Sequence, residues 1–598
     1  MPNISFTGAK KRKTRHSGYV FKMSRPELDY TTPAPSGLLS LVDELLLNII
    51  DHIDNRESLV TLASTCMRFQ SLVEPYIWRD LLVLTGHHAR NISQALDDSE
   101  RRVGYVQSLS VRYQDKHREG IEELNFFISL MARLKHLTIE SPCPNNLEWR
   151  AGHYFDGYSR IDYANLLAQA VYPRAGVPIA LPMLQTLSLH GHGSGDQKFL
   201  LGRAKAMFFH PSLRKITLSC LNLEGEMDND LLKEKRKATP LQSLTLIECN
   251  VDIEFLDRVL SLPRALRELS VGERLHVFDC KPSLDPKKRT SSTLFLTALQ
   301  QQADSLKRLV HIGGQLALMP RPERDPQGPA KLRSLTSLEH LELGLESHLN
   351  YSLRNNGFPP SLKSLKILDA AVSLSAMHDP HDPESMAETP LRSITSLLTD
   401  CMPSSVQPDF TIHLHFSDHA LFRFIVATHP TTANRFLSTK ILDRNAMYKI
   451  ATLLKSYNGR FIVSREIFRS GTSYIPPYMY GEEEPDEELM YDSNDYWRVT
   501  GIDYQLMDDD QLRAKMIKDN TLKRCRECTL NSRSFDECRS TGDGSPCLVC
   551  NREQMVCRWS WNKAENEDSD DDDDDEDEEL DRDEVDAAEA LLQQILWH

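Results

Sequence analysis

The sequence predicts an α/β protein in which a short helical module precedes a long solenoid of stacked strands, with disordered ends. Three observations predict this class. Apolar residues stand at helical spacing over residues 39–81, a phrase of aliphatic residues recurs nine times between residues 106 and 367, and both ends are strongly charged. At 598 residues, of which 40% are hydrophobic, the chain is long enough for several domains.

The charge of the chain is concentrated at its two ends. Residues 1–26 hold seven Lys/Arg and no acid, while residues 565–586 hold 17 Asp/Glu and one Arg. The formal net charge of −16 equals that of the acidic tail, so the rest of the chain sums to zero. We expect residues 1–38 and 563–598 to be disordered, apart from a short helix at the end of the tail, because such segments cannot bury a core.

The basic arm carries a candidate nuclear import signal. Five of six consecutive residues are cationic: Lys10, Lys11, Arg12, Lys13 and Arg15. Such a cluster on a flexible arm is typical of import signals, and a basic arm that contacts the acidic tail is the alternative. No apolar run reaches the roughly 18 residues of a membrane span, and no apolar signal-peptide region follows the N-terminus. We therefore expect a protein of the nucleus or cytoplasm with no membrane partner.

The helical module is predicted at residues 39–85. Leu41, Leu45 and Ile49 recur at intervals of four residues, which places them on one face of a first helix. A polar break at residues 54–57 separates a second apolar run, and Pro75 is expected to end or restart a third helix. Three helices this short bury little alone, so we expect them to pack on a partner or on the rest of the chain.

The order of residues in this module resembles the F-box. The family pattern is Leu-Pro-x-Glu-Leu-Leu, then a spaced Leu, Ser/Thr-Cys, Phe and a Trp-Arg pair. It is matched by Leu41, Glu44, Leu45, Leu46, Leu59, Leu62, Thr65, Cys66, Phe69, Leu72, Pro75, Trp78 and Arg79. Val42 stands where the family usually has the proline that pre-sets the first helical turn, so adaptor affinity is expected to be lower than is typical. An ordinary three-helix element inside a larger α domain is the alternative.

The F-box resemblance implies a partner and a role. The module would dock a Skp-type adaptor within a cullin ubiquitin ligase through Leu41, Glu44, Leu45, Ile49, Leu62 and Trp78. The chain itself would be a non-catalytic subunit that raises the effective concentration of a protein substrate near a ubiquitin-charged partner. An F-box protein that acts outside any ligase is a further possibility.

A phrase of the form Leu-x-x-Leu-x-Leu recurs within residues 100–420. Its copies begin at Val106, Leu134, Leu184, Leu213, Leu241, Leu266, Leu306, Leu338 and Leu362. Most steps between copies lie near the roughly 20–29 residues of a leucine-rich repeat. In such a repeat the Leu-x-Leu pair forms a short strand that only neighbouring repeats can cover. We therefore expect an irregular leucine-rich-repeat solenoid whose curved surface presents a protein substrate, with independent Leu-rich α/β units as the alternative.

Beyond residue 400 the phrase fades. Residues 410–416 alternate like a terminal strand, and residues 421–515 are expected to form a region of helices and loops, including a surface loop at residues 475–505.

Two histidines of the expected terminal strand, His413 and His415, would share one face of it. Together with Asp418 and His419 they resemble the His-x-His-x-Asp-His signature of metallo-hydrolases. One extra residue stands between His415 and Asp418. Because no second group of ligands can be placed beside them, we interpret them as surface histidines.

Six of the twelve cysteines lie within residues 520–562. They are Cys525, Cys528, Cys538, Cys547, Cys550 and Cys557, with the spacing C-x2-C-x9-C-x8-C-x2-C-x6-C. Each C-x2-C pair can give two thiolates to a tetrahedral zinc ion. So small a segment needs the free energy of metal binding in order to fold. The segment resembles the fungal binuclear zinc cluster, which implies one or two zinc ions held by these six cysteines. Unmetallated cysteines in a disordered tail are the alternative.

The first half of this cysteine segment departs from the family. Nine residues separate Cys528 from Cys538, instead of the usual six, and they carry one cation, Arg533, and two acids. Contacts with DNA require cations. The sequence therefore argues against sequence-specific nucleic-acid binding, and a nuclear zinc-cluster regulator associated with DNA is the second-ranked function.

Overall fold

The structure is a computed structural model, and it describes residues 37–140, 159–172, 176, 178–191, 201–273, 292–313, 331–344, 347, 349, 352–353, 357–368, 409–416, 444–467, 486–493 and 528. The chain divides into two compact units, Met1–Val73 and Glu74–His598. The basic arm, the acidic tail and five of the six clustered cysteines lie outside the described residues. Among the described helices, none combines the length and the apolar character that crossing a bilayer requires.

The first unit consists of short helices. A 3-10 turn, η1 (Leu38–Ser40), leads into α1 (Asp43–Ile50), followed by α2 (Arg56–Thr65) and α3 (Met67–Ile77), within which the unit ends. The Asn55 side chain caps α2 by accepting from the N–H groups of Glu57 and Ser58 at 2.7 and 3.3 Å. The expectation that Pro75 ends or restarts a helix is wrong. Pro75 lies two residues before the end of α3, where the missing N–H costs a single hydrogen bond.

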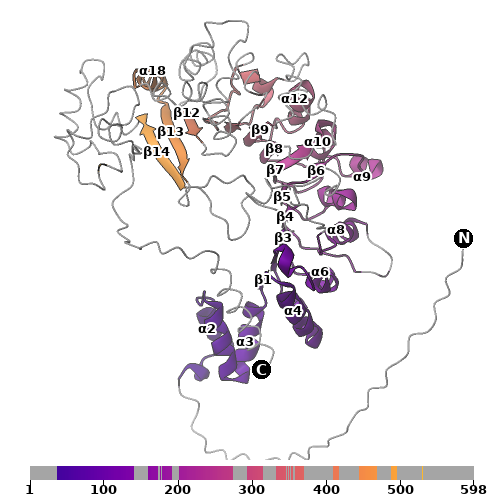
Figure 1. Ribbon diagram of the computed structural model, residues 1–598. Helices are drawn as coiled ribbons and strands as arrows, with labels where there is room; N and C mark the ends of the chain where they lie inside the picture. The colour runs from indigo at the N-terminus through magenta and orange to yellow at the C-terminus, as the bar shows by residue number, and fades with distance from the viewer. Residues whose placement is uncertain are drawn as a thin grey trace, which may run out of the picture. The chain divides into compact units, whose positions relative to one another are not determined.

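The second unit is built on one sheet whose strands follow the order of the chain (Figure 1). Adjacent strands are parallel, except that the last one runs antiparallel to its neighbour. In the described residues they are β1 (Asp80–Val83), β2 (Ser108–Arg112), β3 (His136–Glu140), β4 (Thr186–His190), β5 (Lys215–Ser219), β7 (Ser243–Val251), β8 (Glu268–Glu273), β9 (Arg308–Ile312), β10 (His340–Leu343), β11 (Ser364–Ile367), β12 (Thr411–Phe416), β13 (Arg460–Ile467) and β14 (Asp486–Asp492), with β6 (Asn222–Leu223) paired to β7. The predicted α/β class with a large parallel sheet is confirmed.

Helices connect the strands and lie along the outer side of the sheet in Figure 1. The described helices of this unit are α4 (Gly86–Asp98), α5 (Glu100–Val103), α6 (Leu124–Leu130), α8 (Tyr163–Val171), α9 (Asn229–Glu234), α10 (Ile253–Leu260), α12 (Ser292–Gln300) and α18 (Arg444–Lys455), with 3-10 segments η2 (Asp115–His117), η3 (Ile121–Glu123), η4 (Gly202–Phe209) and η6 (Leu332–Ser334). Side chains of Thr85, Asp162, Asp228 and Asp252 cap the first turns of α4, α8, α9 and α10.

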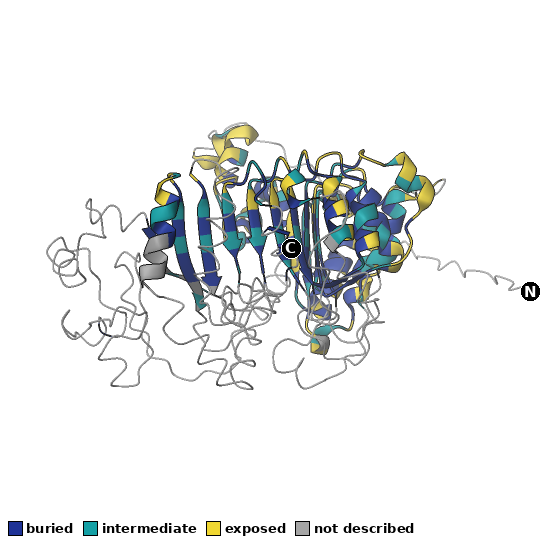
Figure 2. Ribbon diagram, turned by 90° about the horizontal axis from the view of Figure 1, so that it is seen from above, coloured by how far each residue is buried: buried dark blue, intermediate teal, exposed yellow. Residues whose placement is uncertain are grey.

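In eight of the nine copies of the recurring phrase, the last two positions are apolar and lie on a strand. The copy that begins at Leu306 is degraded, with Leu309 and His311 at these positions of β9. Direct pairing between neighbouring strands joins these residues in one row: Leu109, Leu137, Leu187, Ile216, Leu244, Leu269, Leu309, Leu341, Leu365 and Ile412. Every member of the row is at most 1% exposed. Burial of one such side chain contributes about 1.5–3 kcal/mol. The alternation of buried and partly exposed residues appears as bands across the strands in Figure 2, so the core lies between the sheet and the helices.

The sheet extends beyond the limits predicted for the repeat region. β1 lies within the predicted helical module, and β13 and β14 lie within residues 421–515, so β12 is not the terminal strand. These strands lack the Leu phrase. β13 buries Phe461 and Val463 instead. The expectation of a surface loop at residues 475–505 is wrong for the acidic β14, all of which lies within that range. Arg460 joins β14 to β13, and its Nε donates to Asp492 Oδ1 at 2.9 Å.

Candidate functional site

Arg68 of α3 holds the chain just before α1. Its guanidinium donates to the carbonyl oxygens of Leu39 and Leu41 at 2.7 and 2.6 Å. The same group donates twice to Asp43 Oδ1, at 2.9 Å from Nε and 2.7 Å from Nη2. The planar fork of a guanidinium suits such a set of acceptors. Arg68 thus fixes η1 and the first turn of α1. Sequence reasoning missed it because its acceptors are mostly backbone oxygens.

Helix α1 buries one apolar pair and exposes another. Leu46 and Ile50 are each 1% exposed, whereas Leu45 and Ile49 are 49% and 43% exposed. Val42, the N-cap residue of α1, is 57% exposed. Residues three and four apart lie on the same side of a helix, so Val42, Leu45 and Ile49 form one apolar strip.

Exposed apolar side chains are concentrated in the first unit. Of the thirteen large hydrophobic residues that are exposed in the described part of the chain, six lie between residues 38 and 67. They are Leu38, Leu39, Val42, Leu45, Ile49 and Met67. We call the first five of these, on η1 and α1, the α1 surface. Exposed apolar patches of this kind mark sites of interaction with other proteins.

The remaining residues predicted to bind an adaptor differ in accessibility. Glu44 is exposed, and Leu41 and Leu62 are half-buried. Trp78 is only 2% exposed and belongs to the second unit. Its predicted contact with an adaptor does not fit this structure, because the indole is covered by the protein itself.

The environment of Trp78 explains its burial. The guanidinium carbon of Arg102 lies 5.1 Å from the centre of the Trp78 ring, a cation–π arrangement. Arg102 Nε donates to Glu74 Oε1 at 2.8 Å, and Arg101 Nη2 lies 2.6 Å from Glu74 Oε2. Glu74 is 6% exposed, so both arginines compensate a buried carboxylate. Trp78 therefore packs against Arg102, which with Arg101 forms ion pairs to the buried Glu74 at the start of the second unit.

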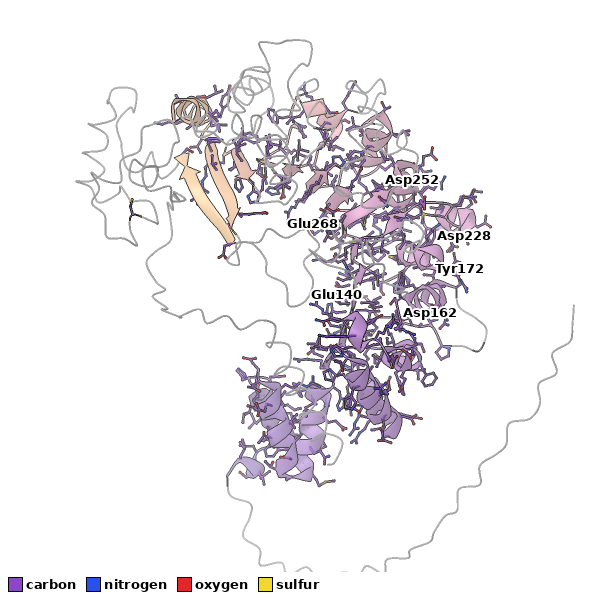
Figure 3. All side chains as sticks on the ribbon, viewed as in Figure 1. Glu140, Asp162, Tyr172, Asp228, Asp252 and Glu268 are labelled. Atoms are coloured by element: carbon purple, nitrogen blue, oxygen red, sulfur yellow. The ribbon has the colours of Figure 1, made fainter. Side chains whose placement is uncertain are left out.

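The sheet face opposite the helices is polar and is the second candidate surface. One row of paired residues on this face is Ser110, Thr138, Ser188, Thr217, Thr245 and Ser270. Figure 3 shows Glu140 and Glu268 on this side, and the capping residues Asp162, Asp228 and Asp252 on the side of the helices. In the described part of the chain, all six hydroxyl side chains of this row are half-buried, so the row presents a polar surface.

Charged residues on this face pair with each other. Arg112 Nε lies 3.3 Å from Glu140 Oε1. Lys307 and Lys363 both donate to Glu339, at 2.8 and 2.6 Å, which lowers the pKa of that carboxyl to about 2. The side chains of Lys307 and Lys363 are each 57% exposed, so their pairs with Glu339 contribute little to stability.

The histidines interpreted as surface residues lie in a polar cluster. His415 is 5% exposed, so that interpretation is wrong for it, and His413 is half-buried. Asp418 and His419 lie outside the described residues. Glu487 of β14 lies beside the histidines, 3.3 Å from His413 Nε2. Sequence reasoning missed Glu487 because it lies more than seventy residues further along the chain.

Only some of the cysteines lie in the part of the chain that the structure describes. Cys220 and Cys249 are fully buried, as expected for scattered thiols, and Cys66 is half-buried. Cys528 is also buried. Zinc binding by the six clustered cysteines stays a prediction, because the other five lie outside the described residues.

No protein-family model matches this chain, and no curated protein is detectably similar to it. Its function is therefore inferred from its own residues and surfaces.

Proposed function

We propose that this chain is the substrate-recognition subunit of a Skp–cullin–F-box ubiquitin ligase. The observation that carries the proposal is the α1 surface, in which Leu45 and Ile49 of the F-box-like pattern are about half exposed. The first unit would bind the adaptor, and through it the cullin. The second unit would bind a protein substrate, and the chain would contribute proximity rather than chemistry.

The energetics of the α1 surface favour a protein partner. Full burial of an aliphatic side chain contributes about 1.5–3 kcal/mol, so covering the exposed half of Leu45 or Ile49 contributes roughly 1 kcal/mol each. Arg68 already fixes η1 and the start of α1. A surface that is ordered before binding loses less conformational entropy on binding.

The second unit supports the substrate-binding part of the proposal. We interpret it as a leucine-rich-repeat solenoid, because the Leu phrases pair in register along consecutive parallel strands. Stacked repeats offer long continuous surfaces for partners. The polar sheet face, with its row of hydroxyl side chains, is the surface we assign to the substrate.

The adaptor-binding role predicts a specific loss of binding. The double variant Leu45→Lys, Ile49→Lys should abolish co-purification of a Skp-type adaptor with the full-length chain. Lysine keeps helix propensity, and both side chains are exposed, so circular dichroism and the melting temperature should stay the same. Met67→Lys is the matched control, because Met67 is 81% exposed but lies on α3. Adaptor binding by the double variant at the level of the control would contradict the proposal.

A proline at position 42 is expected to strengthen the same site. Val42 has φ −69° and ψ 155°, close to the geometry that proline imposes. The preceding Leu41 has φ −69° and ψ 148°, the extended conformation that a following proline requires. Val42→Pro should therefore stabilise the first unit by about 0.4–1 kcal/mol by restricting the unfolded chain, and should lower the adaptor Kd.

Urea unfolding and adaptor titration of the full-length chain measure both effects. Val42→Ala is the control, since it removes the same side chain without restricting the backbone. A proline variant that is less stable than the alanine variant would show that the backbone before α1 does not adopt this extended conformation in solution.

Two predictions made from the sequence are independent of this proposal. Nuclear import through Lys10–Arg15 and zinc binding at residues 520–562 both concern segments that are almost wholly outside the described residues. The second-ranked function, a nuclear zinc-cluster regulator, draws no support from the described part of the chain.

A further inference from the structure

Four polar side chains from three strands converge at the β12–β14 end of the sheet. His413 Nε2 and His415 Nδ1 lie 2.6 and 3.0 Å from Ser464 Oγ. Ser464 Oγ lies 2.6 Å from Glu487 Oε1. The same carboxylate oxygen is 3.3 Å from His413 Nε2 and 3.7 Å from His415 Nδ1. The potential ligand atoms of the two histidines and Glu487 all lie within 4.8 Å of one another.

Strand register creates this convergence. His413 and His415 are two residues apart on β12, so their side chains leave the same face. His415 pairs directly with Ser464 of β13. The pairing of β13 with β14 is irregular between Val463 and Ser464, and β-bulges commonly redirect side chains near functional sites. Glu487 on β14 completes the group.

The polar atoms of this cluster are close enough for one cation to replace their mutual hydrogen bonds. His415 Nε2 lies 3.2 Å from Glu466 Oε1, so the proton of a neutral His415 ring belongs on Nε2, and Nδ1 is an acceptor. Glu487 Oε1 lies 3.3 Å from His413 Nε2 and 2.6 Å from Ser464 Oγ. The Ser464 hydroxyl has one proton. It can donate to only one of His415 Nδ1 and Glu487 Oε1 at a time, and His413 Nε2 is a second donor within reach of Glu487.

We propose that His413, His415 and Glu487 bind one Zn²⁺, with Ser464 Oγ as the fourth ligand. Two imidazoles and a carboxylate are a donor set that zinc uses in proteins. Zinc–ligand bonds of about 2.0–2.1 Å place tetrahedral ligands roughly 3.3 Å apart. The distances of 3.3 and 3.7 Å from Glu487 to the two ring nitrogens fit this spacing. To reach the same spacing, the serine oxygen would move away from His413 Nε2 and Glu487 Oε1 by about 0.7 Å and from His415 Nδ1 by about 0.3 Å.

The surroundings of the cluster fit a zinc site. His413 is half-buried and His415 is 5% exposed, so both rings are partly shielded from water. Glu466 accepts from the outer nitrogen of His415, an outer-shell contact typical of zinc-bound histidine. Lys366 Nζ lies 3.9 Å from Glu487 Oε1. Its charge lowers the affinity for a cation, but its side chain is 24% exposed, so it can turn toward solvent.

The proposed ion is structural rather than catalytic. The four ligands close the coordination sphere, and Ser464 is 1% exposed, so no position is left for a substrate. The site would tie the antiparallel strand β14 to β12 and β13. An edge strand presents unpaired backbone groups to other chains. The bound ion would hold the edge strand β14 in its place in the sheet. The site shares no ligand with the cysteine segment.

Metal content of the full-length chain tests the site. The wild type, Glu487→Gln, His413→Ala and His340→Ala are stripped with a chelator, dialysed against the same dilute ZnCl₂ solution and analysed for zinc. His340 is the matched control, because it is an exposed histidine on the same face whose ring contacts Ser364 at 2.7 Å. Any zinc in the cysteine segment contributes equally to all four proteins.

We expect the wild type and His340→Ala to bind one more zinc per chain than Glu487→Gln and His413→Ala. Zinc should also raise the melting temperature of the wild type and His340→Ala more than that of Glu487→Gln and His413→Ala. Glu487→Gln keeps the shape of the side chain at a position that is 48% exposed, so it decides the test even if His413→Ala does not fold. Equal zinc content in the wild type and Glu487→Gln would overturn the site and leave a hydrogen-bond network. Adaptor binding is not needed for either result.

Discussion

Replacing Trp78 with alanine is expected to lower the free energy of unfolding of the second unit by about 3–5 kcal/mol. The indole is 2% exposed, so its removal leaves a large cavity. It also uncovers the pair of Arg102 with the buried Glu74, whose carboxylate is joined to the guanidinium at 2.8 Å. Urea unfolding followed by far-UV circular dichroism measures the loss.

The neighbouring arginine supplies the control for this prediction. Arg79 follows Trp78 directly, and its side chain is 50% exposed and paired with Asp80. Arg79→Ala should change the unfolding free energy by only about 0–1 kcal/mol, as for other surface ion pairs. If Trp78→Ala unfolded at the same urea concentration as Arg79→Ala, the indole would not be part of the core.

Acid is expected to destabilise the second unit through His210. This histidine follows η4 and is 1% exposed. Burial lowers its pKa to about 4, against about 6.5 in an unfolded chain. The folded state therefore binds fewer protons than the unfolded state between these values. Its contribution to stability is complete above pH ~6.5 and is lost as the pH falls toward 4, at roughly 1.4 kcal/mol per pH unit and about 3 kcal/mol in total.

Comparison with a non-titrating variant isolates the contribution of His210. His210→Asn keeps a small polar side chain near the N–H of Ser212, which lies 3.3 Å from His210 Nδ1. The difference in unfolding free energy between wild type and variant should shrink by about 3 kcal/mol from pH 7 to pH 4. A pH-independent difference for His210→Asn would show that this imidazole is already accessible to protons.

The α1 surface was predictable only in part. The spacing of apolar residues in α1 is ambiguous, because Leu45 and Leu46, like Ile49 and Ile50, stand side by side in the sequence. Packing of α1 within its unit buries Leu46 and Ile50 and leaves the other pair exposed. Trp78 fits the F-box pattern by position, yet its burial depends on Arg102, which comes 24 residues later.

The sequence by itself determined the α/β class and the positions of most strands, because alternation of buried and polar residues is a local pattern that each Leu phrase carries. Only the tertiary structure decided which strands complete the sheet. β1, β13 and β14 lack the phrase and form by pairing with neighbours already in place. The cluster of His413, His415, Ser464 and Glu487 arises in the same way. The three strands that carry its members are far apart in the chain, and strand register brings the side chains within ligand distance.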